Sequence, residues 1–176
     1  MKSLKFLLLS AFILLLSNSV SAQKFGIRAG ANISDINADF DSSTLTGLYV
    51  GVYKEIPLVK NLLFVQPEIQ YSQEGFSTDV NDVKLDYLTV PVLAKIYALK
   101  LLSFETGPQF GFLVNDNVDY GDPNSYVTTW AFGTSLNLPF GLSINARYIT
   151  GLDDAFDNPT LSGKNQVYQI GAAFQF

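Results

Sequence analysis

The sequence QVYQIGAAFQF, residues 166–176, decides the fold class of this chain because its side chains alternate in character. The apolar positions are Tyr168, Ile170, Ala172, Phe174 and Phe176, and the residues between them are small or polar. A β-strand points successive side chains to opposite faces, so the stretch predicts a strand with one large apolar face and one small polar face. The apolar face needs either a protein core or lipid to cover it, and the rest of the chain decides which.

The composition favours a β-sheet protein and excludes several kinds of chemistry. Aromatic residues make up 14% of the 176 residues, charged residues 15%, and there are 13 glycines; aromatic and β-branched side chains suit a pleated sheet. Cysteine and histidine are absent, which excludes thiolate zinc sites, disulfides and histidine-based acid–base chemistry. The net charge of −5 and the lack of a basic run give nucleic-acid binding no electrostatic support. We therefore expect no enzyme, no cofactor, no metal centre and no nucleic-acid partner.

Residues 1–22 match the three parts of a secretory signal peptide. Two lysines precede an apolar stretch, Phe6 to Leu16, and Val20-Ser21-Ala22 supplies the small residues before a cleavage site. The apolar stretch is about half of the ~20 residues that a transmembrane helix needs, so a retained helix is the weaker interpretation. We predict cleavage at this site, which leaves residues 23–176 as a single domain.

Alternation followed by turn residues recurs along the mature chain and predicts eight strands. The strands are predicted at 24–34, 45–54, 62–72, 84–97, 101–114, 126–138, 142–149 and in the final stretch. Pro67 lies within the third strand and predicts a bulge or a position that donates no ladder hydrogen bond. The connections 35–44, 73–83, 115–125 and 150–165 are long, and 55–61, 98–100 and 139–141 are short. Long loops at one end and short turns at the other are typical of an up-and-down barrel in a bacterial outer membrane.

The two faces of the predicted strands indicate which side of the sheet is inside. One face carries bulky apolar residues such as Trp130 and Phe132, while the other carries glycine, serine, glutamine and few charges. A soluble barrel would expose the glycine-rich face, which lacks the charges of a water-soluble surface, and its narrow lumen would have to hold the bulky face. In a membrane barrel the bulky face contacts lipid and the small residues fill the lumen. We therefore predict an all-β, eight-stranded antiparallel up-and-down transmembrane β-barrel over residues 23–176, after a cleaved signal peptide.

Five charged residues interrupt the small-residue face, each on a different predicted strand: Arg28, Glu68, Lys95, Glu105 and Arg147. In the barrel they point into the lumen, where paired charges are tolerated and isolated charges are costly. We predict an interior ionic network that plugs the barrel; the alternative is a polar path for small solutes. Glu68 and Glu105 also suggest a carboxylate pair for hydrolysis, but the arginine and lysine residues on neighbouring strands explain them better.

Acidic residues gather in the four long predicted loops. They are Asp35, Asp39, Asp41, Glu74, Asp79, Asp82, Asp116, Asp119, Asp122, Asp153, Asp154 and Asp157. A solvated outer rim is the simplest interpretation, and the alternative is weak binding of calcium or magnesium by these hard oxygen ligands. The densest run, residues 115–122, lacks the closing glutamate of a calcium loop. The same external loops are the surface on which we expect protein partners from the envelope.

Several short motifs of the mature chain resemble those of one known family. They are Gly26-Ile27-Arg28-Ala29-Gly30-Ala31-Asn32, Tyr87-Leu88-Thr89-Val90-Pro91-Val92-Leu93-Ala94-Lys95, Gly107-Pro108-Gln109-Phe110-Gly111, Asn145-Ala146-Arg147-Tyr148 with Gly151-Leu152, and the terminal Phe176. In these motifs the chain resembles the PorT-like outer-membrane β-barrel family, also labelled porin family or outer-membrane protein β-barrel domain. The resemblance implies the fold, an outer-membrane location and the lipid bilayer as partner, but no defined activity. Members usually carry an acidic residue where Thr89 stands, so the resemblance implies a different interior network here.

These features predict a structural or interactive role in the cell envelope, namely membrane integrity, adhesion or service as an accessory subunit of an envelope complex. The alternative function is a narrow porin-like channel for small solutes. A soluble periplasmic barrel that binds lipid fits the pattern less well.

Overall fold

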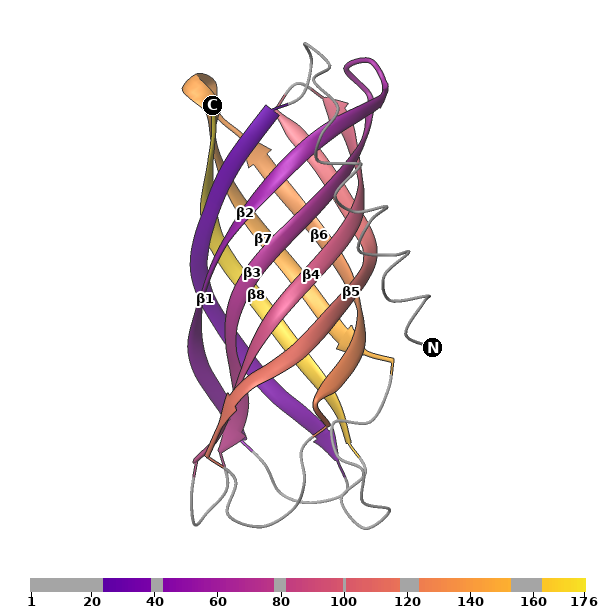
Figure 1. The fold of residues 1–176 in the computed structure, drawn as a ribbon. Coiled ribbons are helices and arrows are strands. Elements are labelled where there is room, and N and C mark those ends of the chain that lie inside the picture. Colours follow the sequence, from indigo (N-terminus) through magenta and orange to yellow (C-terminus); the bar gives the residue numbers. More distant parts are fainter. Residues whose placement is uncertain (1–23, 39–42, 78–81, 100, 118–123, 153–162) are drawn as a thin grey trace, which may run out of the picture.

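The strands of the chain close into one barrel (Figure 1). A computed structural model describes residues 24–38, 43–77, 82–99, 101–117, 124–152 and 163–176. The elements are β1 (Lys24–Ala38), β2 (Ser43–Val59), β3 (Leu63–Ser77), β4 (Asp82–Leu99), β5 (Leu102–Asp116), β6 (Tyr126–Asn137), the 3₁₀ turn η1 (Pro139–Gly141), β7 (Leu142–Gly151) and β8 (Gly163–Gln175). Each strand pairs antiparallel with its neighbours in sequence, and β1 pairs with β8. The predicted fold class is confirmed, whereas the predicted signal peptide lies outside the described residues and stays a prediction.

The stretch that decides the fold class also closes the barrel. β8 pairs with β1 so that Ala172 lies opposite Ala29 and Gly171 opposite Gly30. Just beyond β8, the backbone N–H of Phe176 donates a 2.9 Å hydrogen bond to the carbonyl of Phe25. Because the first and last strands pair, the sheet has no open edge, which is the condition for placing a sheet in hydrocarbon.

The strands run further than the sequence predicts at the end opposite the short turns. The predicted loops 35–44 and 73–83 shrink to the connections 39–42 and 78–81, which lie outside the described residues. The loop assignment of Asp35, Glu74, Asp82 and Asp116 is therefore wrong, since all four lie in strands. Polar residues near a strand end resemble a loop in sequence, yet the β3–β4 ladder continues to the pair Ser77 and Asp82. A membrane-spanning strand needs about 9–11 residues, so β2 and β4, with 17 and 18 residues, extend beyond the hydrocarbon.

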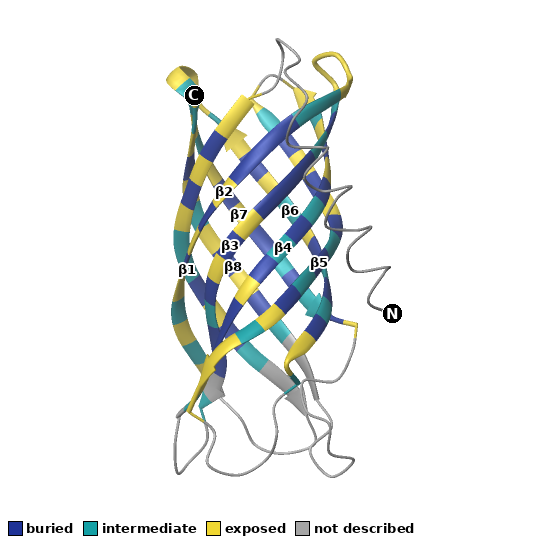
Figure 2. Ribbon diagram, in the orientation of Figure 1, coloured by how far each residue is buried: buried dark blue, intermediate teal, exposed yellow. Residues whose placement is uncertain are grey.

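The bulky face of the sheet points outward, as the sequence predicts. Phe132 and Ile170 are 52% and 56% exposed, whereas Arg28 and Glu68 on the other face are 3% and 1% exposed. Figure 2 shows this as alternating exposed and buried bands along the strands. The half-buried Trp130 donates its indole N–H to the Thr106 hydroxyl at 2.9 Å, which satisfies a donor that lipid would leave unpaired. Within the described ranges, no helix has the length and apolar character needed to cross a membrane.

Large side chains enter the lumen where a facing residue is glycine. Tyr53 is buried and lies opposite Gly26 in the β1–β2 ladder. A Cβ atom at position 26 would occupy the place of the Tyr53 ring. Glycine is therefore required at this position because an eight-stranded lumen has space for only one of two facing side chains.

Pro67 causes no bulge in the third strand. The β3–β4 register is the same on both sides of it, with Pro67 opposite Val92 and, further along, Gln70 opposite Thr89. On its other side, the β2–β3 ladder passes from Tyr53–Glu68 to Ile56–Val65 without a register shift. Of the two predicted explanations, the non-donating ladder position is the one that the structure supports.

Replacing a lipid-facing residue near the middle of a strand with a charge should destabilise the barrel. We expect Ile170→Arg to lower the free energy of unfolding by about 2–4 kcal/mol, because the guanidinium would lie in hydrocarbon. The matched control is Leu99→Arg at the exposed last residue of β4, where the barrel meets the membrane interface and the expected loss is about 0–1 kcal/mol. Urea unfolding in phospholipid vesicles measures both values, and equal losses would contradict the outward orientation.

Candidate functional site in the barrel lumen

Four of the five predicted lumen charges meet in one cluster. Arg28 comes from β1, Glu68 from β3, Glu105 from β5 and Arg147 from β7, so every second strand supplies one member. All four side chains are buried. We call these four residues the lumen ionic cluster. Inward-pointing residues of alternate strands share one layer of a small barrel, which is why residues far apart in sequence come together.

Arg147 joins the two carboxylates of the lumen ionic cluster. Its Nε and Nη2 groups donate to Oε1 of Glu105 at 2.9 and 2.6 Å. Its Nη1 and Nη2 groups donate to Oε2 and Oε1 of Glu68 at 3.1 and 2.9 Å. Gly133 lies opposite both Glu105 and Arg147 in the two ladders of β6, and a Cβ there would lie 2.8 Å from Cγ of Glu105. The ion pair therefore forms across the space that Gly133 leaves.

Arg28 of β1 completes the cluster. Its Nη1 group donates to Oε1 of Glu68 at 2.8 Å and lies 3.7 Å from Oε1 of Glu105. Its Nη2 group donates to Oδ1 of Asn145 at 2.7 Å, and the Tyr49 hydroxyl donates to the same oxygen at 2.9 Å. The guanidinium also lies 5.8 Å from the centre of the Tyr49 ring, an arrangement typical of a cation–π contact.

The cluster balances its charges within the lumen. Two guanidinium groups face two carboxylates, and Gln66 and Gln70 donate further hydrogen bonds to Glu68. A buried charge is tolerated only when it is paired and hydrogen-bonded, and removing one partner leaves the other uncompensated. The cluster is thus a set of mutually dependent side chains that ties four strands together across the lumen.

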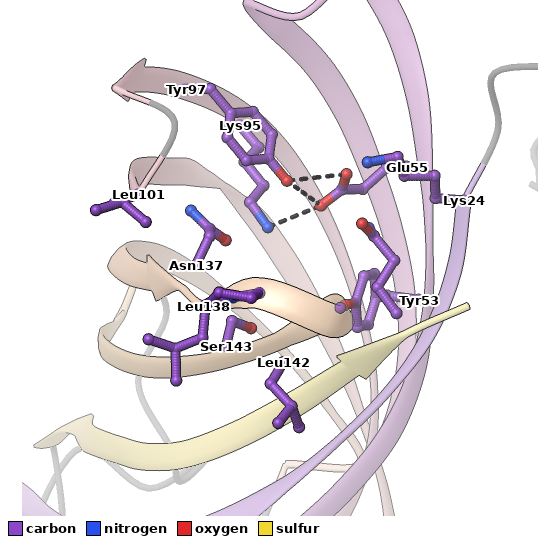
Figure 3. Close-up of a pocket in the computed structure, with 13 residues that line it drawn as sticks. Lys24, Tyr53, Glu55, Lys95, Tyr97, Leu101, Asn137, Leu138, Leu142 and Ser143 are labelled. Atoms are coloured by element: carbon purple, nitrogen blue, oxygen red, sulfur yellow. Dashed lines mark hydrogen bonds and ion pairs between the residues drawn. The ribbon is translucent and has the colours of Figure 1, made fainter.

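The fifth predicted residue, Lys95, pairs elsewhere. Although Lys95 lies opposite Glu105 in the β4–β5 ladder, its ammonium donates to Oε1 of Glu55 at 2.8 Å. The Tyr97 hydroxyl donates to both oxygens of Glu55 at 2.9 and 3.0 Å (Figure 3). The structure therefore divides the five predicted residues between two groups, because the ammonium of Lys95 pairs with Glu55 near the short turns.

Glu55 is a charged lumen residue that the sequence analysis missed, as is the buried Glu74 of β3. Glu55 falls in a predicted short connection, whereas β2 continues to Val59 and buries Glu55 completely. The signal was present in the sequence, since the inward alternation Gly47, Tyr49, Gly51 and Tyr53 reaches position 55 without a break.

Apolar residues and amide groups fill much of the remaining lumen. Leu93, Ala131, Ile149 and Val167 form one buried cluster, and Leu85, Tyr87 and Val127 form another. Among the described residues, buried amide atoms without a protein partner include Oε1 of Gln66, Gln70 and Gln109 and both amide atoms of Gln169. Such atoms are typical places for ordered water.

The carboxylates of the described residues form no cluster of metal-binding side chains, and those of Glu68 and Glu105 are paired with arginine. No group of three or more metal-binding side chains is found in the described ranges. Most acidic residues of the predicted loops, such as Asp119 and Asp153, lie outside those ranges, so weak cation binding there stays a prediction. Glu68 and Glu105 share the guanidinium of Arg147, so each carboxylate is paired with a cation.

A closed barrel with a lipid-facing apolar surface and a compensated ionic lumen defines a small outer-membrane β-barrel protein. The chain belongs to the outer membrane protein beta-barrel domain family, whose model matches residues 18–157. The protein is accordingly located in the outer membrane, with the lipid bilayer around it. No curated protein matches the chain in sequence.

Solved structures of similar architecture include outer-membrane and surface proteins of low sequence identity. Ail, the attachment invasion locus protein of Yersinia pestis, is 18% identical in its complex with the heparin analogue sucrose octasulfate, with a TM-score of 0.56 over 88% of this chain and 99% of that chain. A second structure of Ail is 16% identical, with a TM-score of 0.58 over 87% and 98% of the two chains. Neisserial surface protein A is 13% identical, with a TM-score of 0.56 over 86% and 97%. Identities this low show the common fold alone.

Removing the central guanidinium should destabilise the barrel strongly. We expect Arg147→Met to lower the free energy of unfolding by about 3–5 kcal/mol, because Glu68 and Glu105 would remain buried without their shared partner. Arg147→Lys should also destabilise, since an ammonium lacks the planar fork that reaches both carboxylates. The control is Lys84→Met, which removes an exposed cation near the first residue of β4, away from the lumen ionic cluster. Urea unfolding in vesicles gives the values, and a loss for Arg147→Met no greater than that of the control would contradict the role of the cluster.

Proposed function

We propose that this chain is a non-enzymatic structural or interaction protein of the outer membrane whose lumen is closed by the lumen ionic cluster. The observation that carries the proposal is the four-way contact among Arg28, Glu68, Glu105 and Arg147, which crosses the lumen from wall to wall. An eight-stranded barrel has an interior just wide enough for side chains, so the single layer of paired charges in the lumen ionic cluster is sufficient to close it. Because the lumen is closed, we assign partner binding to the external loops.

The apolar packing of the lumen supports closure. The buried cluster of Leu93, Ala131, Ile149 and Val167 contains residues from four strands. A charged solute that passed this layer would lose its hydration without gaining a polar partner.

The similar structures are consistent with an envelope role at the cell surface. Ail is described as an attachment invasion locus protein bound to a heparin analogue, and the Neisserial protein as a surface protein. The acidic loops and net charge of −5 disfavour a sulfated polysaccharide as ligand here, because like charges repel. The resemblance to the PorT-like group supports an accessory subunit of an envelope complex as the particular form of this role.

The second candidate function is a narrow channel for small solutes. It is favoured by the buried amide atoms without a protein partner, on Gln66, Gln70, Gln109 and Gln169, which suit a hydrated interior. A channel of this kind requires the lumen ionic cluster to open.

Conductance in planar bilayers separates a plugged barrel from a channel. We expect the wild-type protein to show no steady single-channel current, and the double variant Glu68→Ala/Arg147→Ala to conduct. The double variant removes one charge of each sign, and it leaves Arg28 and Glu105 as neighbours 3.7 Å apart, so it opens space without leaving a net buried charge.

The control for this measurement is Ile144→Ala, which truncates an exposed residue of the lipid-facing surface. It should leave the current unchanged. A wild-type current that the double variant does not alter would overturn the plug and favour the channel.

The interaction role is tested at the external loops. Replacing Asp153, Asp154 and Asp157 with asparagine keeps the length of the loop that the sequence predicts at 150–165 and removes three charges, so we expect it to weaken electrostatic partner contacts. Cross-linking in native envelopes, followed by mass spectrometry, measures which proteins are captured by each form. Capture of the same partners at the same yield by the wild-type and neutralised proteins would count against partner binding through this loop.

A further inference from the structure

A cavity of about 330 Å³ opens at the short-turn end of the barrel. It is lined by the second ion pair, Lys95 and Glu55, together with Lys24, Tyr53, Tyr97 and the segment around η1. Figure 3 shows the Lys95 and Tyr97 side chains from β4 pointing toward Glu55 from β2. Its volume lies near the lower end of the range of small-molecule sites, which is about 300–1,000 Å³.

The charges of the cavity favour an anionic ligand. The Glu55 carboxylate is fully buried and already accepts hydrogen bonds from the Lys95 ammonium and the Tyr97 hydroxyl. Lys24 lies opposite Glu55 in the β1–β2 ladder, lines the cavity and is exposed. Among the described residues, Lys24 takes part in no ion pair within 4.0 Å. The cavity therefore has two ammonium groups and one carboxylate, and a single negative charge would balance them.

One wall of the cavity is apolar. Leu101, Leu138 and Leu142 line it from the short turns, and all three side chains are exposed. Asn137 and Ser143 add polar groups beside this wall. A ligand with both an anionic group and a short aliphatic part would contact each type of surface.

We propose that this cavity binds a small carboxylate that carries an aliphatic group, with the carboxylate beside Lys24 and Lys95 and the aliphatic part against the leucines. A peptide with a free carboxyl terminus and a free fatty acid both have this chemistry. In bacterial outer-membrane barrels the short-turn end faces the periplasm, so the ligand enters from that side. The site stands on its own lining residues, and it requires neither conduction nor closure of the lumen ionic cluster.

The binding test uses the full barrel in lipid nanodiscs and three small probes. N-acetyl-leucine represents a peptide carboxyl terminus, octanoate represents a fatty acid, and N-acetyl-leucinamide is the neutral match of the first. Amide chemical shifts of Ser143 and Gln175, which line the cavity, report binding by NMR, and empty nanodiscs correct for partitioning into lipid. We expect at least one carboxylate to bind about ten-fold more tightly than the amide, because charge-assisted hydrogen bonds are stronger than neutral ones.

Two single variants complete the test. Lys24→Gln should weaken carboxylate binding about ten-fold while leaving the Lys95–Glu55 pair intact, so the barrel stays folded, as heat-modifiable gel mobility checks. Lys84→Gln, an exposed lysine outside the cavity, should leave binding unchanged.

Tighter binding of N-acetyl-leucine than of octanoate would identify a peptide terminus as the source of the carboxylate, and the reverse order would identify a fatty acid. Two results would overturn the site. One is equal affinity for N-acetyl-leucine and its amide together with no binding of octanoate. The other is carboxylate binding that Lys24→Gln leaves unaltered. The conductance of the wild-type protein is unaffected by either result, so failure of this site is distinguishable from failure of the plug.

Discussion

The structure depends on one constraint: in hydrocarbon, every backbone N–H and C=O group of a sheet must find its partner within the sheet. The pairing of β8 with β1 meets this constraint by removing both edges. Closure also determines the orientation of the faces, because the outside of a closed sheet contacts lipid and the inside contacts only itself. Most of the bulky apolar residues point outward for this reason, and only small apolar clusters such as Leu93, Ala131, Ile149 and Val167 are buried in the lumen.

Closure with eight strands makes the lumen narrow, and the narrow lumen controls which residues it can hold. Glycine stands where a large side chain must enter, as at Gly26 opposite Tyr53 and at Gly133 between Glu105 and Arg147. The buried charges of the lumen ionic cluster and of the Lys95–Glu55 pair are held as compensated sets, since an isolated buried charge is costly. The lumen ionic cluster and the Lys95–Glu55 pair both follow from this limit, one spanning four alternate strands and the other lying near the short turns.

The two ion-pair sites have different surroundings, and this difference separates their roles. The carboxylates and guanidinium groups of the lumen ionic cluster pair with one another and with neighbouring amides, leaving Nε of Arg28 without a partner, and this pairing suits closure. The Lys95–Glu55 pair borders an open cavity with an additional lysine and an apolar wall, which suits binding.

The sequence by itself determined the strand number, the outward direction of the bulky face and the inward position of Arg28, Glu68, Glu105 and Arg147, because side-chain alternation with a period of two is a local property. Only the tertiary structure decided the partners. Arg28 lies beside Gly51 and Ala173 in its own ladders but pairs with Glu68, two strands away. Lys95 lies beside Glu105 but pairs with Glu55. Such contacts cross the lumen between residues about 40 positions apart in sequence, and they depend on strand tilt and barrel closure, which no local pattern encodes.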